Sequence, residues 1–252
     1  MMIKEKSTRK RWNKKHLFWI ISLALLLAFA VTFLVYTGDY YRADETAVAA
    51  LSSDGSVAVA RTDYGWFFDG PSDENALIFY PGAKVEETAY APLLHRLAAE
   101  GMDVCLVRMP FHLAFFGINK AGAVMKQYDY AHWYIGVHSL GGAMSTGYAS
   151  KHGDLLDGVI LFGAYAYKPL DKHLTELLIF GSEDGLSTVE KVEKARVYAP
   201  ETYFEKCIGG GNHAQFGNYG IQTGDGTAAI SAEEQQAIAV KLIIEVISTP
   251  AD

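Results

Sequence analysis

The sequence predicts an α/β fold in which a mostly parallel, doubly wound sheet carries helices on both faces, preceded by an N-terminal transmembrane helix. From residue 76 onward, short apolar runs alternate with amphipathic stretches, which is the pattern of strands connected by helices. Such alternation favours a parallel sheet, because each helical crossover returns the chain to the same edge. Of the 252 residues, 50% are hydrophobic and 20% are charged, a composition and length that suit one globular domain.

The individual elements follow from hydrophobic periodicity and from turn residues. Residues 47–62 are expected to form two short strands around an Asp54-Gly55 turn. Further strands are expected at 76–82, 102–110, 132–139, 156–165, 174–185 and 201–210. Helices are expected at 87–101, 114–128, 141–152, 187–198 and 231–248. The last helix begins with a capping box of Ser231 and Glu234.

The first forty residues have the pattern of a membrane anchor. Residues 17–36 are twenty residues without a charge, long enough to cross a bilayer as a helix. Seven Lys and Arg residues lie among the first fifteen, so residues 1–16 are interpreted as a basic cytoplasmic leader. The positive-inside rule then places the following body outside the cytoplasm. The folded domain is expected to occupy residues 45–250.

The alternative is a signal peptide that is cleaved, which would make the protein secreted. Ala28, Phe29 and Ala30 resemble a cleavage site of the small-x-small kind. However, the apolar run continues through Tyr36, so this site falls within the hydrophobic segment. We therefore favour a single-pass protein of the cell membrane with its folded domain on the extracytoplasmic side.

The distribution of charge argues against a nucleic-acid partner. The formal net charge is −7, although the first fifteen residues contain seven basic residues and a single acidic one. The remainder of the chain is therefore more acidic than the total suggests. Binding of nucleic-acid phosphates needs a basic face, which this composition does not favour.

Ser139 is the candidate nucleophile. It ends the apolar strand predicted at 132–139 and precedes Gly141 and Gly142, which open a helix. This strand–turn–helix context is that of a nucleophile elbow, whose tight turn needs small residues beside the nucleophile. Val137 stands two residues before the serine, where the elbow pattern has glycine, so the sequence departs from the pattern at that position.

A serine hydroxyl becomes a strong nucleophile only when a base takes its proton. His213 is the candidate base, because it follows the last predicted strand within a glycine-rich turn. Asp184 is the candidate acid, at the end of the strand predicted at 174–185, with Glu183 beside it as a rival. Since the carboxyl ends of parallel strands share one edge of a sheet, Ser139, Asp184 and His213 are expected to meet there as a catalytic triad.

Acyl transfer also needs two donors directed at the oxyanion. One is expected to be the backbone N–H of Leu140, and the other that of Ala83, where Gly82 lets the backbone approach closely. About ten residues, 164–173, separate two predicted strands, and this short connection is expected to leave the cleft open. Three residues near strand ends are candidate lining of the pocket: Gly82, His112 and Tyr165.

A family resemblance rests on four segments of the sequence, at 80–101, 136–144, 180–186 and 209–231. They resemble the α/β-hydrolase superfamily, and within it the small, lid-poor bacterial hydrolases that are similar to dienelactone hydrolases. The resemblance covers about residues 45–248. It implies the α/β-hydrolase fold and a serine-esterase mechanism, and it names no substrate.

Together these features predict a carboxylesterase-like serine hydrolase that acts on a small-molecule or polymeric ester, with the membrane as its other partner. Neither a ligand set with metal spacing nor a phosphate loop stands in the sequence, so no cofactor is expected. A peptidase or an acyltransferase with the same triad remains an alternative. So does an anchored binding protein without activity, because a fold does not imply a function.

Overall fold

The computed structural model describes residues 13–139 and 141–248, which belong to two compact units that divide after Asp39. The first unit contains α1 (Lys14–Gly38), where the Asn13 side chain caps the helix by accepting a hydrogen bond from the backbone N–H of Lys15. This helix is long and apolar enough to cross a membrane, a property that signal sequences share. The anchor predicted at 17–36 lies within α1, whereas most of the basic leader lies outside the described residues.

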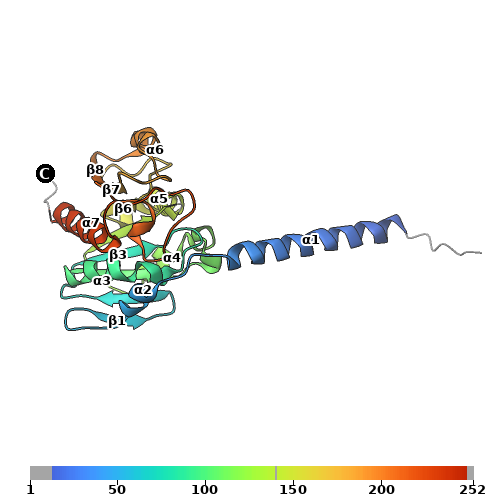
Figure 1. Ribbon diagram of the computed structural model, residues 1–252, viewed down its shortest axis with the longest axis horizontal. Coiled ribbons are helices and arrows are strands. Elements are labelled where there is room, and N and C mark those ends of the chain that lie inside the picture. Colours follow the sequence, from blue (N-terminus) through green and yellow to red (C-terminus); the bar gives the residue numbers. More distant parts are fainter. Residues whose placement is uncertain (1–12, 140, 249–252) are drawn as a thin grey trace, which may run out of the picture. The chain divides into compact units, whose positions relative to one another are not determined.

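The second unit is built on one sheet of eight strands (Figure 1). The strands lie in the order β1-β2-β4-β3-β5-β6-β7-β8, and they span Ala58–Arg61 (β1), Gly65–Asp69 (β2), Asn75–Tyr80 (β3), Met102–Val107 (β4), His132–His138 (β5), Gly158–Phe162 (β6), Thr175–Gly181 (β7) and Thr202–Ile208 (β8). The β1–β2 and β2–β4 pairs are antiparallel, and every pair from β4 to β8 is parallel. The predicted mostly parallel sheet is confirmed.

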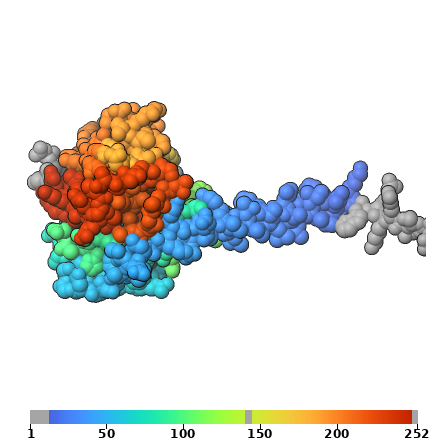
Figure 2. Space-filling view, in the orientation of Figure 1, coloured from blue at the N-terminus to red at the C-terminus, as the bar shows by residue number. Residues whose placement is uncertain are grey.

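Helices cover both faces of this sheet, as predicted. The α-helices of this unit that the structure describes are α2 (Glu45–Ala49), α3 (Ala91–Ala99), α4 (Lys120–Met125), α5 (Gly141–His152), α6 (Val189–Ala195) and α7 (Ala232–Ile247). Leu77 and Phe79 of β3 are buried in the core with α3 and α7, whereas Ile78 between them is buried with α4, α5 and α6. Figure 2 shows the C-terminal residues, in orange and red, as one continuous surface on one side of this unit.

The prediction for residues 47–62 is wrong in its first half. The segment begins with α2, whose N-terminus is capped by the Asp44 carboxylate accepting from the backbone N–H of Ala47, 2.8 Å away. Alanine-rich sequence has a high helix propensity, and this cap stabilises the first turn. Asp54 does form a turn, in which its carboxylate accepts from the backbone of Ser56 and Val57. The hairpin itself lies further on, between β1 and β2.

Other predicted elements are present but shorter. The helix predicted at 87–101 is a 3₁₀ turn, η1 (Glu87–Tyr90), followed by α3. The helix predicted at 114–128 is another 3₁₀ turn, η3 (Ala114–Gly117), followed by α4. The strand predicted at 102–110 ends earlier, as β4 at Val107, and Pro110 begins the short turn η2 (Pro110–His112).

Glu176 is a buried carboxyl in β7 whose side chain lies on the same face of the sheet as Leu178. The residue is 2% exposed, and its Oε2 atom has no hydrogen-bond partner among the described residues. Burial disfavours the charged form and raises the pKa of Glu176 to about 7. The carboxyl is therefore held neutral below that pH.

Replacement of Glu176 by glutamine is expected to stabilise the protein at pH 8 but not at pH 4.5. Because the pKa is raised from 4.5 to about 7 on folding, the folded state binds the proton more tightly. The penalty for ionisation therefore grows from pH 4.5 to 7 and reaches about 3 kcal/mol above that range. Urea unfolding of the full chain in detergent, at both pH values, measures the difference. The exposed Glu100→Gln serves as control, and an equal effect of Glu176→Gln at the two pH values would contradict the assignment.

Candidate functional site

Ser139 stands in a sharp turn between β5 and α5. Its φ of 57° lies in the left-handed region, which few residues other than glycine adopt. The backbone N–H of Ser139 donates to the carbonyl of Phe162, 3.0 Å away, which ties the turn to the end of β6. Val137, the departure from the elbow pattern, is fully buried in the core before the turn. Local strain of this kind is often stored at functional sites.

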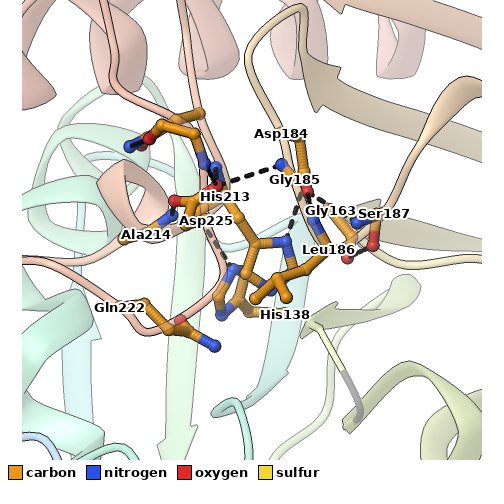
Figure 3. Close-up of polar contacts among 12 residues, drawn as sticks. His138, Gly163, Asp184, Gly185, Leu186, Ser187, His213, Ala214, Gln222 and Asp225 are labelled. Atoms are coloured by element: carbon orange, nitrogen blue, oxygen red, sulfur yellow. Dashed lines mark hydrogen bonds and ion pairs between the residues drawn. The ribbon is translucent and has the colours of Figure 1, made fainter.

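His213 and Asp184 form a buried pair at the carboxyl ends of β8 and β7. The His213 Nδ1 atom lies 2.9 Å from Asp184 Oδ2, and the two side chains are 1% and 0% exposed (Figure 3). Since a carboxylate only accepts hydrogen bonds, Nδ1 carries a proton, and in the neutral form of the ring Nε2 is then an acceptor. Nε2 is buried and has no hydrogen-bond partner among residues 13–139 and 141–248. It is therefore available to take a proton.

Backbone amides hold the Asp184 carboxylate in place. Its Oδ1 atom accepts from the N–H groups of Leu186 and Ser187, at 2.8 and 2.6 Å, which leaves Oδ2 for His213. The rival acid, Glu183, instead accepts a hydrogen bond from the Ser182 hydroxyl at 3.0 Å. Of the two adjacent carboxylates, the structure brings Asp184 to the histidine.

Gly163, which the sequence prediction missed, lies directly against this pair. Its φ is +50°, and a Cβ atom at this position would lie 2.8 Å from His213 Nδ1 and 3.0 Å from Asp184 Oδ2. Its carbonyl accepts a hydrogen bond from the Ser187 hydroxyl, so the turn after β6 also supports the loop that carries Asp184 (Figure 3). A larger residue here would displace the pair. The sequence offers only a glycine after a buried strand as a signal.

Asp225 is a second residue that the sequence prediction missed. Its Oδ1 atom accepts from the backbone N–H groups of His213 and Gly185, at 3.1 and 3.2 Å, and its Oδ2 atom accepts from Ala214 N–H at 2.8 Å (Figure 3). One carboxylate thus connects the loop of the histidine with the loop of Asp184. The available signal in the sequence is a short acidic residue between two glycines.

Ser139 and His213 line one cavity of about 280 Å³. Tyr165, a predicted pocket residue, also lines it, and the Lys191 ammonium lies at its wall and donates to the Leu186 carbonyl at 2.7 Å. The described lining consists of Ser139, Ala164, Tyr165, Tyr167, Leu186, Ser187, Lys191 and His213. No helix interrupts the connection from β6 to β7, which agrees with the predicted absence of a helical lid.

The other predicted site residues lie in neighbouring loops. Gly82 is close to the turn, since a Cβ added there would lie 3.6 Å from Ser139 Cβ. His112 is not in the described lining of the cavity; its ring stacks on Tyr40 with centroids 3.9 Å apart. Leu140 lies outside the described residues.

Three successive amides of the loop after β3 have different partners. The N–H of Gly82 donates to the Tyr90 hydroxyl at 3.0 Å, and the N–H of Lys84 donates to the His112 carbonyl at 2.8 Å. The amide of Ala83 between them has no partner in the described part of the chain. Of these three amides, it is therefore the one whose N–H is left without a partner in that part of the chain. Within the same described part, no group of three or more His, Cys, Asp and Glu residues could hold a metal ion.

Comparisons with known proteins agree with this architecture. The model of a family described as "Alpha/beta hydrolase family" matches residues 76–237, and no curated protein matches the sequence significantly. Among solved structures, a predicted CIB-like hydrolase from Thermoplasma acidophilum has 16% identity and a TM-score of 0.54, covering 75% of this chain and 100% of that one. A putative dienelactone hydrolase from Klebsiella pneumoniae has 14% identity and a TM-score of 0.54, covering 78% and 100%. The carboxylesterase CesB from Bacillus subtilis has 9% identity and a TM-score of 0.52, covering 87% and 100%.

Proposed function

Because the chain belongs to the alpha/beta hydrolase family, we propose that it is a serine hydrolase that cleaves carboxylic esters through an acyl-enzyme. The observation that carries the proposal is the position of His213. Its Nδ1 atom is held by Asp184, its Nε2 atom is free to accept a proton, and its ring lines the same cavity as Ser139. Two of the similar structures bear the names of a carboxylesterase and a dienelactone hydrolase, which supports an ester as the substrate.

In the proposed reaction, His213 Nε2 takes the hydroxyl proton of Ser139 as the serine oxygen attacks the ester carbonyl. The Asp184 carboxylate keeps the imidazole in the required tautomer and stabilises the imidazolium that forms. The N–H groups of Ala83 and Leu140 donate to the oxyanion. His213 then returns the proton to the leaving alkoxide, and a water molecule hydrolyses the acyl-enzyme by the same route.

The proposed setting is a membrane surface outside the cytoplasm. The apolar helix α1 would serve as an uncleaved anchor, with the basic leader on the cytoplasmic side. The cavity of about 280 Å³ suits a short acyl group better than a long one. The alcohol part of the ester would extend through the mouth of the cavity, since the described connection from β6 to β7 contains no helix that would restrict its size.

The test uses the full chain in detergent with p-nitrophenyl acetate and with a fluorophosphonate probe. We expect turnover of the ester, loss of turnover on labelling, and a single phosphonate adduct on the peptide that contains Ser139. A tryptic digest analysed by mass spectrometry locates the adduct, and heat-unfolded protein is the control for unspecific labelling. Folded protein that shows neither turnover nor label, or an adduct on another serine, would overturn the proposal.

A further inference from the structure

His138 precedes the candidate nucleophile, but its side chain takes part in a buried hydrogen-bond network. The residue is 0% exposed. Its Nδ1 atom lies 2.8 Å from the Tyr90 hydroxyl, and its Nε2 atom lies 3.0 Å from the backbone carbonyl of His213. The Tyr90 hydroxyl in turn lies 3.0 Å from the backbone nitrogen of Gly82. Three hydrogen bonds therefore connect Gly82, Tyr90, His138 and His213.

The donor and the acceptor of each hydrogen bond follow from the two ends of the network, the His213 carbonyl and the Gly82 N–H. A carbonyl only accepts, so His138 Nε2 must carry a proton and donate to His213. Burial is the main cause that lowers the pKa of His138 well below its usual value, and the neighbouring His213 lowers this pKa further. The ring is therefore neutral, and Nδ1 is an acceptor. The Tyr90 hydroxyl then donates to Nδ1, and its oxygen accepts the N–H of Gly82. In this arrangement, each of the three hydrogen bonds of the network has one donor and one acceptor.

The four residues come from four different parts of the fold. Gly82 lies in the loop after β3, Tyr90 ends η1, His138 ends β5, and His213 follows β8. The packing around the network is tight, because a Cβ atom on Gly82 would lie 2.9 Å from both His138 Nδ1 and the Tyr90 hydroxyl. The network thus joins the loop that carries the Ala83 amide to the loop that carries the His213 ring.

We propose that His138 and Tyr90 are positioning residues that hold the Ala83 amide at the correct distance from Ser139 and His213. The proposal rests on the proposed esterase function. The Gly82 N–H belongs to the peptide unit before the Gly82–Ala83 bond, and the Gly82 carbonyl of that bond accepts from the Val85 N–H at 3.3 Å. The hydrogen bond from the Gly82 N–H to Tyr90 fixes the other side of the Gly82 backbone, so the orientation of the Ala83 amide is restricted from both sides. An oxyanion donor contributes only when it points to the place where negative charge develops. The network should therefore act on the transition state and leave the binding of the neutral ester unchanged.

The central test is Tyr90→Phe, which removes one hydroxyl and with it two of the three hydrogen bonds. We expect kcat for p-nitrophenyl acetate to fall about 10- to 100-fold, with KM changed less than about threefold. Binding of a trifluoromethyl ketone, which forms an oxyanion on the serine, should weaken by the same factor as kcat/KM.

The matched control is Tyr64→Phe. Tyr64 is also buried, and its hydroxyl bonds to the Tyr128 hydroxyl at 2.7 Å, in the core on the side of α4 and α5. This control should lose stability but keep its kcat and its affinity for the ketone. Equal kinetic effects of the two variants, in full chains that are folded by circular dichroism, would overturn the positioning role. Absence of turnover by the unaltered protein would instead reject the proposed function.

A second pair of variants tests His138 itself. In His138→Gln the side-chain amide can donate to the His213 carbonyl and accept from Tyr90, whereas in His138→Leu it can do neither. We expect the glutamine variant to retain at least about tenfold more of kcat than the leucine variant, with similar KM values. Equal kcat values for two folded variants would contradict a positioning role for His138.

Discussion

Replacing Ser139 with alanine is expected to lower kcat for ester hydrolysis by at least about 10⁴-fold, because it removes the hydroxyl of the proposed nucleophile. Removal of the hydroxyl leaves the Asp184–His213 pair intact, since that pair is held by the amides of Leu186 and Ser187. Substrate binding and the thermal midpoint of the variant should therefore stay close to those of the unaltered protein. Steady-state hydrolysis of p-nitrophenyl acetate by the full chain measures the loss.

A glycine at the same position distinguishes a functional serine from a structural one. Ser139 has a φ of 57°, a conformation that costs a residue with a Cβ atom on the order of 1 kcal/mol. Ser139→Gly relieves this strain, so it should be more stable than Ser139→Ala by about that amount and equally inactive. If either variant keeps its fold and retains more than about 1% of the kcat of the unaltered protein, Ser139 is not the nucleophile.

Replacing Asp184 with asparagine is expected to lower kcat by about 10³- to 10⁴-fold. The amides of Leu186 and Ser187 both donate to Oδ1, so the carbonyl oxygen of an asparagine would occupy that position. Its amide nitrogen would then face His213 and donate to Nδ1. The ring proton would move to Nε2, and the imidazole could no longer accept the proton of the serine. The predicted loss follows from a wrong tautomer in an otherwise unchanged site.

Glu183→Gln is the matched control for this variant. The two carboxylates are neighbours in the sequence, but Glu183 accepts its hydrogen bond from the Ser182 hydroxyl, which an amide oxygen can accept equally well. We expect this variant to keep its kcat within about threefold. The opposite result, in which Glu183→Gln loses activity and Asp184→Asn keeps it, would assign the acid to Glu183. Measurement of kcat and KM at pH 7 and 8 for both variants decides between them.

The errors in the predicted elements have local physical causes. Residues 47–51 form a short apolar segment that is compatible with either a strand or a helix. The hydrogen bond from the Ala47 N–H to the Asp44 cap stabilises the helix α2. Backbone turns also shorten the predicted helices near Tyr90 and Ala114. Periodicity identifies the type of a long element well, whereas caps and turns determine where it begins and ends.

The α/β class, the apolar helix and the location of Ser139, Asp184 and His213 after predicted strands were all predicted from the sequence, because these features depend on residues close together in the chain. The hydrogen-bond partner of each polar atom depends instead on the folded structure. That structure placed Asp184 rather than Glu183 against His213, and it brought Gly163, Asp225 and the His138–Tyr90 network to the same place. Some of these contacts join residues that are far apart in the sequence, 29 positions for Asp184 and His213 and 75 positions for His138 and His213. Such distances in sequence are closed only when the parallel strands assemble into one sheet.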